Sequence, residues 1–246
     1  MLELKNVSFK VTDENGTEKT IASNISLNIG DNKFVVITGP NGSGKSTLAR
    51  LIMGIEQPTD GQILLNGRDI THASVYERAN AGISFAFQQP VRFKGLNVLD
   101  LLRIASRKEL TVSEACTYLS SVGLCAKDYI NREVNASLSG GELKRIEIAM
   151  ILARGTILSI FDEPEAGIDL WSFSNLINVF EEMRKNIHGS ILIISHQERI
   201  LNIADEIIVI DGGRISRQGP KEEILPTILG TTAAMIMCSG AKGGVN

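Results

Sequence analysis

The chain has 246 residues, 43% of them hydrophobic and 22% charged, which is the composition of an ordinary folded protein and excludes a disordered or collagen-like chain. Its 25 basic and 28 acidic residues leave a formal charge of −3, so we expect no nucleic-acid partner. We also expect a cytoplasmic protein without direct membrane insertion, because no apolar run approaches the ~18 residues of a spanning helix, the start lacks a secretory-signal pattern, and three cysteines fit neither a disulfide framework nor a zinc site.

The first 30 residues predict an antiparallel hairpin. Val7, Phe9 and Val11 alternate with polar residues, and a similar alternation runs through residues 21–29. Between the two segments lies Asn15-Gly16, a strong turn pair. We therefore expect two paired strands with one buried face.

Four short apolar runs predict a parallel sheet covered on both faces, because strands buried on both sides are continuously apolar. Helical patterns lie between several of them, which favours a doubly wound α/β core. The runs are residues 34–37, 157–161, 191–194 and 207–210.

Residues 92–138 interrupt this pattern and predict a helical subdomain inserted into the core. Asn97 is a good N-cap before apolar residues at helical spacing, and Thr111 with Glu114 forms a capping-box pattern. We expect one domain over residues 1–230. The Gly- and Ala-rich segment 231–246, which contains Cys238, is predicted to be a flexible tail.

A glycine-rich segment predicts a phosphate-binding loop, since it follows an apolar strand, precedes a helical pattern and fits G-x-x-x-x-G-K-[ST]. Such a loop turns backbone N–H groups toward an anion at a helix N-terminus. Lys45 would reach the outer phosphates, and the Ser46 hydroxyl would bind Mg²⁺. The loop reads Gly39-Pro40-Asn41-Gly42-Ser43-Gly44-Lys45-Ser46-Thr47.

Two further segments carry candidate chemistry. The apolar run 157–161 is followed by Asp162 and Glu163. Asp162 would hold Mg²⁺ through water, and Glu163 would polarise an attacking water molecule. Ser139-Gly140-Gly141 begins a predicted helix, where uncovered N–H groups form a second anion site. Two half-sites in one chain suggest a ligand shared between two chains.

These motifs resemble those of the ATP-binding cassette (ABC) ATPase family over about residues 2–220, with the signature LSGGQ appearing as LSGGE at 138–142. The resemblance implies an ATPase that binds ATP and Mg²⁺ between two head-to-tail subunits, each contributing Ser139, Gly140 and Gly141 to the other's nucleotide. It also implies that Gln88 senses Mg²⁺, that Glu163 is the catalytic carboxylate, that Asp169 belongs to the D-loop and that His196 contacts the γ-phosphate.

Local residues are more similar to the SufC branch, whose members work with soluble SufB/SufD-type scaffolds in iron–sulfur cluster assembly. The segments 86–90, 140–145 and 195–201 resemble that branch, including Glu142 where transporter subunits usually carry Gln. Asp162-Glu163-Pro164 is the general family form instead. The alternative is the nucleotide-binding subunit of a membrane transporter, and an ATP-gated clamp without turnover is a third possibility that Glu163 and His196 disfavour.

Two further expectations concern single positions. The family usually stacks an aromatic residue on adenine near the position of Val11, where this chain has none, so base selectivity is open. Lys144 is expected to pair with Glu163 or Glu165 in the free subunit and to restrain the catalytic carboxylate.

Overall fold

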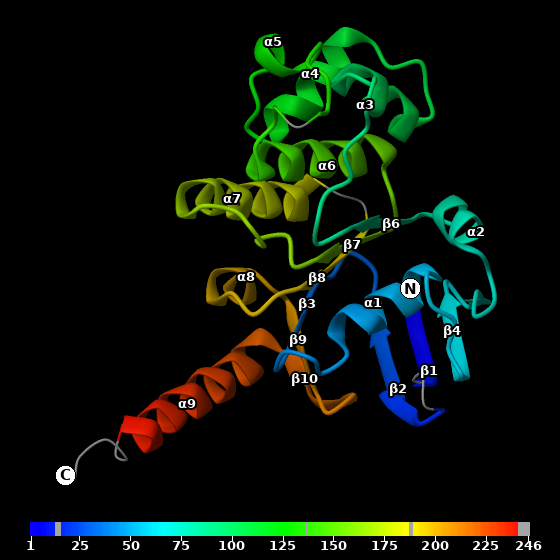
Figure 1. Ribbon diagram of the computed structural model, residues 1–246, viewed down its shortest axis with the longest axis vertical. Helices are drawn as coiled ribbons and strands as arrows, with labels where there is room; N and C mark the ends of the chain where they lie inside the picture. The colour runs from blue at the N-terminus through cyan, green and yellow to red at the C-terminus, as the bar shows by residue number, and fades with distance from the viewer. Residues whose placement is uncertain (13–15, 136, 187–188, 241–246) are drawn as a thin grey trace.

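The structure is a computed structural model that describes residues 1–12, 16–135, 137–186 and 189–240; for Trp171, Asn186 and residues 231–240 it describes the backbone alone. The described strands form two sheets (Figure 1). One is antiparallel with the order β2-β1-β4-β5, and the other has the order β10-β9-β3-β8-β7-β6. The strands are β1 Leu2–Thr12, β2 Glu18–Ile29, β3 Phe34–Thr38, β4 Asp60–Leu65, β5 Arg68–Asp69, β6 Ile83–Ala86, β7 Leu158–Asp162, β8 Ser190–Ile194, β9 Glu206–Asp211 and β10 Arg214–Pro220.

Two groups of helices stand out in Figure 1. Helices α3 to α6 gather at one end of the molecule, beyond the strand edge of β6 and β7, whereas α1 and α2 lie beside the antiparallel strands. The helices are α1 Lys45–Met53, α2 Val75–Asn80, α3 Val98–Ser106, α4 Val112–Ser121, α5 Ala126–Tyr129, α6 Gly140–Arg154, α7 Leu170–Asn186, α8 Glu198–Asn202 and α9 Lys221–Gly240.

The central strands are buried on both faces, as continuous apolar runs predict. In β3, Phe34 and Val36 belong to the core cluster that includes α6 and α7, whereas Val35 and Ile37 belong to the cluster that includes α1 and the antiparallel sheet. Successive side chains of a strand point to opposite faces, so one five-residue strand contributes to both cores.

The parallel strands place the ends of several predicted motifs at one sheet edge. Ile194 of β8 pairs with Ile37 of β3 on one side and with Asp162 of β7 on the other. Ala86 of β6 pairs with Phe161 of β7. The residues that follow these strands therefore emerge side by side, which is where ligands bind in open α/β sheets.

The fold class predicted from the sequence is confirmed, including the antiparallel subdomain and the inserted helices α3 to α5. Helix α9 continues through residues 231–240. Its Ala and Met residues are good helix formers, and no glycine interrupts residues 231–239. Residues 241–246 lie outside the described part, so tail flexibility and the boundary at 230 stay predictions.

Among the described residues, no helix is both long enough and apolar enough to span a bilayer.

Candidate functional site

The glycine-rich loop connects β3 to α1 and is fitted closely to the sheet. Gly39 has φ +139°, and a Cβ there would lie 1.9 Å from the carbonyl oxygen of Ile210 in β9. A glycine is therefore required where the loop leaves the sheet. Gly44 precedes α1 and gives it no side-chain cap, so the first N–H groups of the helix are not covered by a capping side chain.

Lys45 is buried, and its Nζ donates to the carbonyl oxygens of Gly39 and Pro40, each at 2.9 Å. The Oγ of Ser43 is also buried and has no hydrogen-bond partner among the described residues. Within the described chain, this buried cation is held by carbonyl oxygens beside an unpaired hydroxyl and a helix N-terminus, an arrangement that fits a phosphate group.

The first of the two carboxylates at the end of β7 faces the loop. Asp162 is buried and its Oδ1 accepts a hydrogen bond of 2.8 Å from the Oγ of Ser46. Burial raises the pKa of Asp162, and the hydrogen bond from Ser46 opposes that rise. The second, Glu163, has φ +44°, an uncommon conformation for a residue other than glycine.

A cavity of about 460 Å³ lies over the glycine-rich loop. Its wall combines that loop with Glu163 from the end of β7 and His196 from the end of β8. No aromatic side chain is among its described lining residues, and Ile21 of β2 lies in the wall instead. Phe9 packs against the core, so its ring is not offered to a base. Val11 is 38% exposed but is not aromatic.

The donor set fits Mg²⁺ only in the presence of phosphate. No group of three or more His, Cys, Asp or Glu in the described chain could hold a metal ion by itself. Ser46 and Asp162 do offer a hydroxyl and a carboxylate 2.8 Å apart. Mg²⁺ is usually bound by one or two carboxylates together with substrate phosphates and water, which is what this pair allows.

Gln88 belongs to the same site although it follows a different strand. It lies two residues beyond β6, and its Nε2 donates to the Oε2 of Glu163 at 2.6 Å. The structure thus brings together the glycine-rich loop, Gln88, Asp162, Glu163 and His196, which are separated by up to 157 positions (196 − 39) in the sequence.

The remaining predicted residues form a second cluster. Ser139 caps α6. The next residue, Gly140, lies close to Gly167, since a Cβ added at Gly140 would be 3.4 Å from the carbonyl oxygen of Gly167. Asp169 accepts from the backbone N–H of Ser172 at 3.0 Å at the start of α7. None of Ser139, Gly140, Gly141 and Asp169 lines the cavity of the glycine-rich loop.

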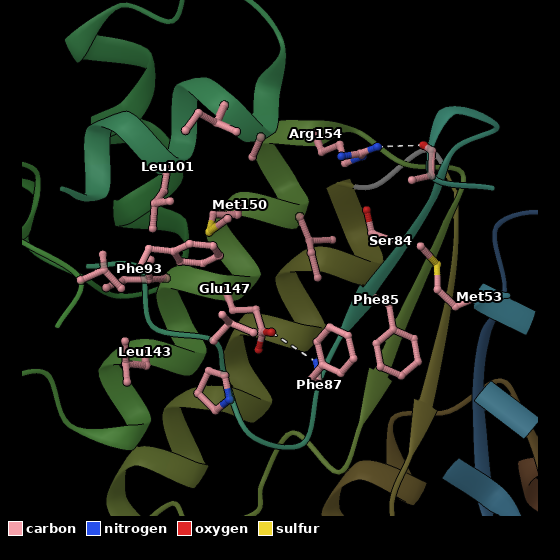
Figure 2. Close-up of a pocket in the computed structure, with 18 of the residues that line it drawn as sticks. Met53, Ser84, Phe85, Phe87, Phe93, Leu101, Leu143, Glu147, Met150 and Arg154 are labelled. Atoms are coloured by element: carbon pink, nitrogen blue, oxygen red, sulfur yellow. Dashed lines mark hydrogen bonds between the residues drawn. The ribbon is translucent and has the colours of Figure 1, made fainter. Parts of the chain in front are cut away.

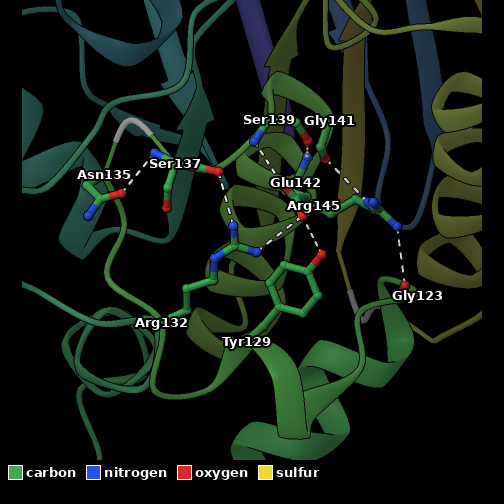
Figure 3. A network of polar contacts seen from close by, with 9 residues as sticks. All are labelled: Gly123, Tyr129, Arg132, Asn135, Ser137, Ser139, Gly141, Glu142 and Arg145. Atoms are coloured by element: carbon green, nitrogen blue, oxygen red, sulfur yellow. Dashed lines mark hydrogen bonds and ion pairs between the residues drawn. The ribbon is translucent and has the colours of Figure 1, made fainter.

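A polar network holds the start of α6 (Figure 3). Glu142 accepts from the backbone N–H of Ser139 at 2.6 Å, from the hydroxyl of Tyr129, and from Arg132 at 3.4 Å. Burial alone would raise the pKa of Glu142, but the hydrogen bonds from Tyr129 and Ser139 and the charge of Arg132 lower it overall. The network ties the helical subdomain to the Ser139-Gly140-Gly141 segment.

Sequence reasoning missed the contact between Glu165 and Ser195. The Ser195 hydroxyl donates to Glu165 and accepts from the backbone N–H of Gln197 at 3.0 Å, so these contacts bracket His196. Glu165 is the second acidic residue after Asp162 in a short loop, and its pairing with a residue 30 positions away has no signal in the local sequence.

The expected partner of Lys144 was wrong. Its Nζ donates to the carbonyl oxygen of Phe87 and lies 3.4 Å from the Oε2 of Glu147 on the same helix, so it makes no ion pair with Glu163 or Glu165. Residues at i and i+3 lie on the same side of a helix, and this near pairing prevails over the loop carboxylates.

Comparison with known proteins agrees with this geometry. The family model described as ABC transporter matches residues 22–166. An uncharacterized ABC transporter ATP-binding protein of Methanocaldococcus jannaschii is 37% identical over 214 residues, covering 84% of this chain and 85% of its own length. A probable ATP-dependent transporter of Cyanophora paradoxa is 35% identical over 237 residues, covering 90% and 89%.

A solved dimeric ATP-binding cassette in a post-hydrolysis state, bound to ADP and phosphate, has the same fold. Its TM-score is 0.78 at 24% identity, with 90% of this chain and 99% of that chain covered. The two relatives are named as transporter proteins, and neither name refers to iron–sulfur assembly, so the narrower resemblance to the SufC branch is not shown.

Proposed function

The chain belongs to the ABC family of ATPases, and from that premise we propose that it is an ATP-binding subunit whose head-to-tail dimer hydrolyses ATP to drive a partner protein. One observation carries the proposal. A single cavity combines the phosphate loop with Glu163 and His196, while Ser139, Gly140 and Gly141 lie outside it. A second copy can then supply these residues to complete the nucleotide site.

Nucleotide binding would use groups that are already oriented. Lys45 would exchange the carbonyls of Gly39 and Pro40 for the β- and γ-phosphates, and the N-terminus of α1 would add its N–H groups and dipole. Ser46, Asp162 and Gln88 would hold Mg²⁺, partly through water. The ion, when bound, neutralises charge on the phosphates.

Hydrolysis would centre on Glu163. Its carboxylate would orient a water molecule in line with the γ-phosphate and take a proton as the oxygen–phosphorus bond forms and the β–γ bond breaks. Gln88 donates to one oxygen of this carboxylate and so fixes its direction. His196, which also lines the cavity, would contact the γ-phosphate, with Glu165 and Ser195 fixing the backbone beside it.

For the partner, we propose a membrane subunit of a transporter. The names of the Methanocaldococcus and Cyanophora relatives support this role better than a soluble scaffold. A SufB/SufD-type scaffold is the second candidate, and the feature that favours it is Glu142, which joins Tyr129 and Arg132 in a network at the signature segment.

Affinity purification of the tagged chain from its native cell tests the partner. Membranes are solubilised with detergent, and the material bound to a Lys45→Ala variant is the control for contacts that do not depend on nucleotide. An integral membrane protein among the ATP-dependent partners is the expected result. A soluble scaffold as the ATP-dependent partner, with no membrane protein, would overturn the transporter role.

A further inference from the structure

Two side chains of helix α6 form hydrogen bonds with the backbone of Phe87, the residue before Gln88. Glu147 accepts a hydrogen bond from the backbone N–H of Phe87 through its Oε1 at 3.3 Å. Lys144, one turn earlier, donates to the carbonyl oxygen of the same residue. The two side chains thus hold both polar groups of Phe87, and they hold each other at 3.4 Å. We call this arrangement the Phe87 clamp.

The burial of Lys144 and Glu147 opposes breaking their hydrogen bonds to Phe87. The Lys144 side chain is 2% exposed and that of Glu147 is 16% exposed, whereas Phe87 and Gln88 lie on an exposed loop. A buried lysine needs its charge and its donors satisfied, and here a carboxylate and a carbonyl do so. Moving Phe87 away would leave the ammonium group without one of these partners, which opposes any shift of the loop.

Phe87 and Glu147 of the clamp line an apolar cavity of about 360 Å³ between β6 and α6 (Figure 2). Phe85, Phe87, Leu143 and Met150 line this cavity, and Glu147 points across it to the backbone of Phe87. The loop therefore contacts α6 through the Phe87 backbone, while the Phe87 ring packs edge-on against that of Phe85 in the cavity wall.

The consequence appears one residue further along the chain. Gln88 directly follows the clamped peptide, and its Nε2 reaches Glu163 at 2.6 Å. The Gln88 side chain keeps this contact only while its backbone stays in place. Gln88 is exposed, however, and lies two positions beyond the last residue of β6, so the strand does not hold it directly. Within the described chain, the side chains that bind the backbone nearest to Gln88 are Lys144 and Glu147, which bind that of Phe87.

We propose that Lys144 and Glu147 are positioning residues that act through Phe87 to hold Gln88 against Glu163. This inference rests on the proposed roles of Gln88 and Glu163 in ATP hydrolysis. It also connects two halves of the dimer, because Lys144 lies five residues, or about 7.5 Å of helix, beyond Ser139. A displacement of α6 by the other subunit's nucleotide would reach Gln88 by this route.

The test is a double variant, Lys144→Met with Glu147→Leu, which removes the clamp without leaving a buried charge unpaired. The matched control is Glu182→Leu with Lys185→Met, an exposed pair of the same spacing in α7. We expect kcat for ATP to fall on the order of tenfold, since small errors in the placement of catalytic groups are costly. The nucleotide Kd of the clamp variant should stay within about twofold of wild type, because the phosphate loop is untouched.

The same substitutions in a Gln88→Ala background separate positioning from a general structural effect. If the clamp acts through Gln88, removing it there should change kcat less than about twofold, since coupled residues are non-additive. An equal fold-loss in both backgrounds, or a wild-type kcat after removal of the clamp, would overturn the proposal. If the double variant does not fold, Glu147→Gln takes its place, with a smaller expected loss that must again vanish in the Gln88→Ala background.

Amide hydrogen exchange over residues 86–89 without nucleotide tests the clamp independently of turnover. We expect faster exchange at Phe87 in the clamp variant than in wild type and the α7 control. Unchanged exchange would overturn the inference. A wild-type protein without ATPase activity, but with this faster exchange in the variant, would overturn the proposed function and leave the mechanical link intact.

Discussion

Replacing Arg78 with Met tests how the helix behind the phosphate loop is anchored. Arg78, in α2, is fully buried and donates to four backbone carbonyls, those of Leu51, Ile52, Thr71 and Ala73, at 2.6–3.0 Å. Leu51 and Ile52 are in the last turn of α1, where carbonyls lack the usual donor four residues on, and the Leu51 carbonyl also accepts from the N–H of the C-cap Gly54 at 3.2 Å. Burial lowers the pKa of Arg78 to about 10, so the side chain is still charged at neutral pH.

The expected loss follows from these contacts. Hydrogen bonds to a charged group contribute about 1.5–3 kcal/mol each, which would give about 6–12 kcal/mol for four. Desolvation of the guanidinium offsets several kcal/mol of this sum. We therefore expect Arg78→Met to lower the free energy of unfolding by about 3–5 kcal/mol, the range for a buried polar network that loses one member.

Urea unfolding followed by circular dichroism measures the loss. Arg78→Lys is the matched variant, because it keeps the charge but places one nitrogen where the guanidinium places three. It should lose about half as much stability as Arg78→Met. A loss below about 1 kcal/mol for Arg78→Met would contradict the reasoning and show that water replaces the side chain at these carbonyls.

Three other predictions follow from the site. Lys45→Ala should weaken ATP binding at least about a hundredfold in a fluorescent-nucleotide titration, because a buried phosphate partner is lost; binding within about fivefold of wild type would contradict it. Gly39→Ala should give little folded protein by circular dichroism, since its Cβ would lie 1.9 Å from the Ile210 carbonyl oxygen, and a soluble, native-like variant would refute this. Glu142→Gln should cost about 1 kcal/mol at pH 7 through its weaker bond with Tyr129. Because folding lowers the pKa of Glu142 below its ordinary value of 4.5, this difference is present above that pH and should vanish as the pH falls through the depressed pKa; a difference that persists in acid would argue against a charge effect.

The sheet core could be predicted because its strands are continuous apolar runs. The strands that the sequence analysis missed lack that signal. Strand β10 is Arg214–Pro220, an edge strand with exposed polar residues, and β6 has four residues, Ile83–Ala86. Strands β4 and β5 are short or partly exposed, so the pairing of β4 with β1 and of β5 with β4 decides their structure more than the local apolar pattern does.

The candidate site was predictable where its chemistry is contiguous in sequence. The phosphate loop and the Asp162-Glu163 pair are read directly, and parallel pairing then brings them together. The Phe87 clamp was not predictable in this way, because Lys144 and Phe87 are 57 positions apart in the sequence. The sequence also offered several carboxylates as alternative partners for the Lys144 side chain. The available signal was a Lys and a Glu three residues apart among the apolar residues of α6, since charged residues are rarely buried unless they are paired.

The central claim is that ATP joins two copies of this chain and that Glu163 then allows them to separate. Light scattering of Glu163→Gln, with and without ATP and Mg²⁺, tests it most directly. The account predicts a single subunit of 26.7 kDa without nucleotide and twice that mass with ATP, together with loss of turnover. A mass that ATP leaves unchanged, or a Glu163→Gln variant that still hydrolyses ATP at the wild-type rate, would contradict it.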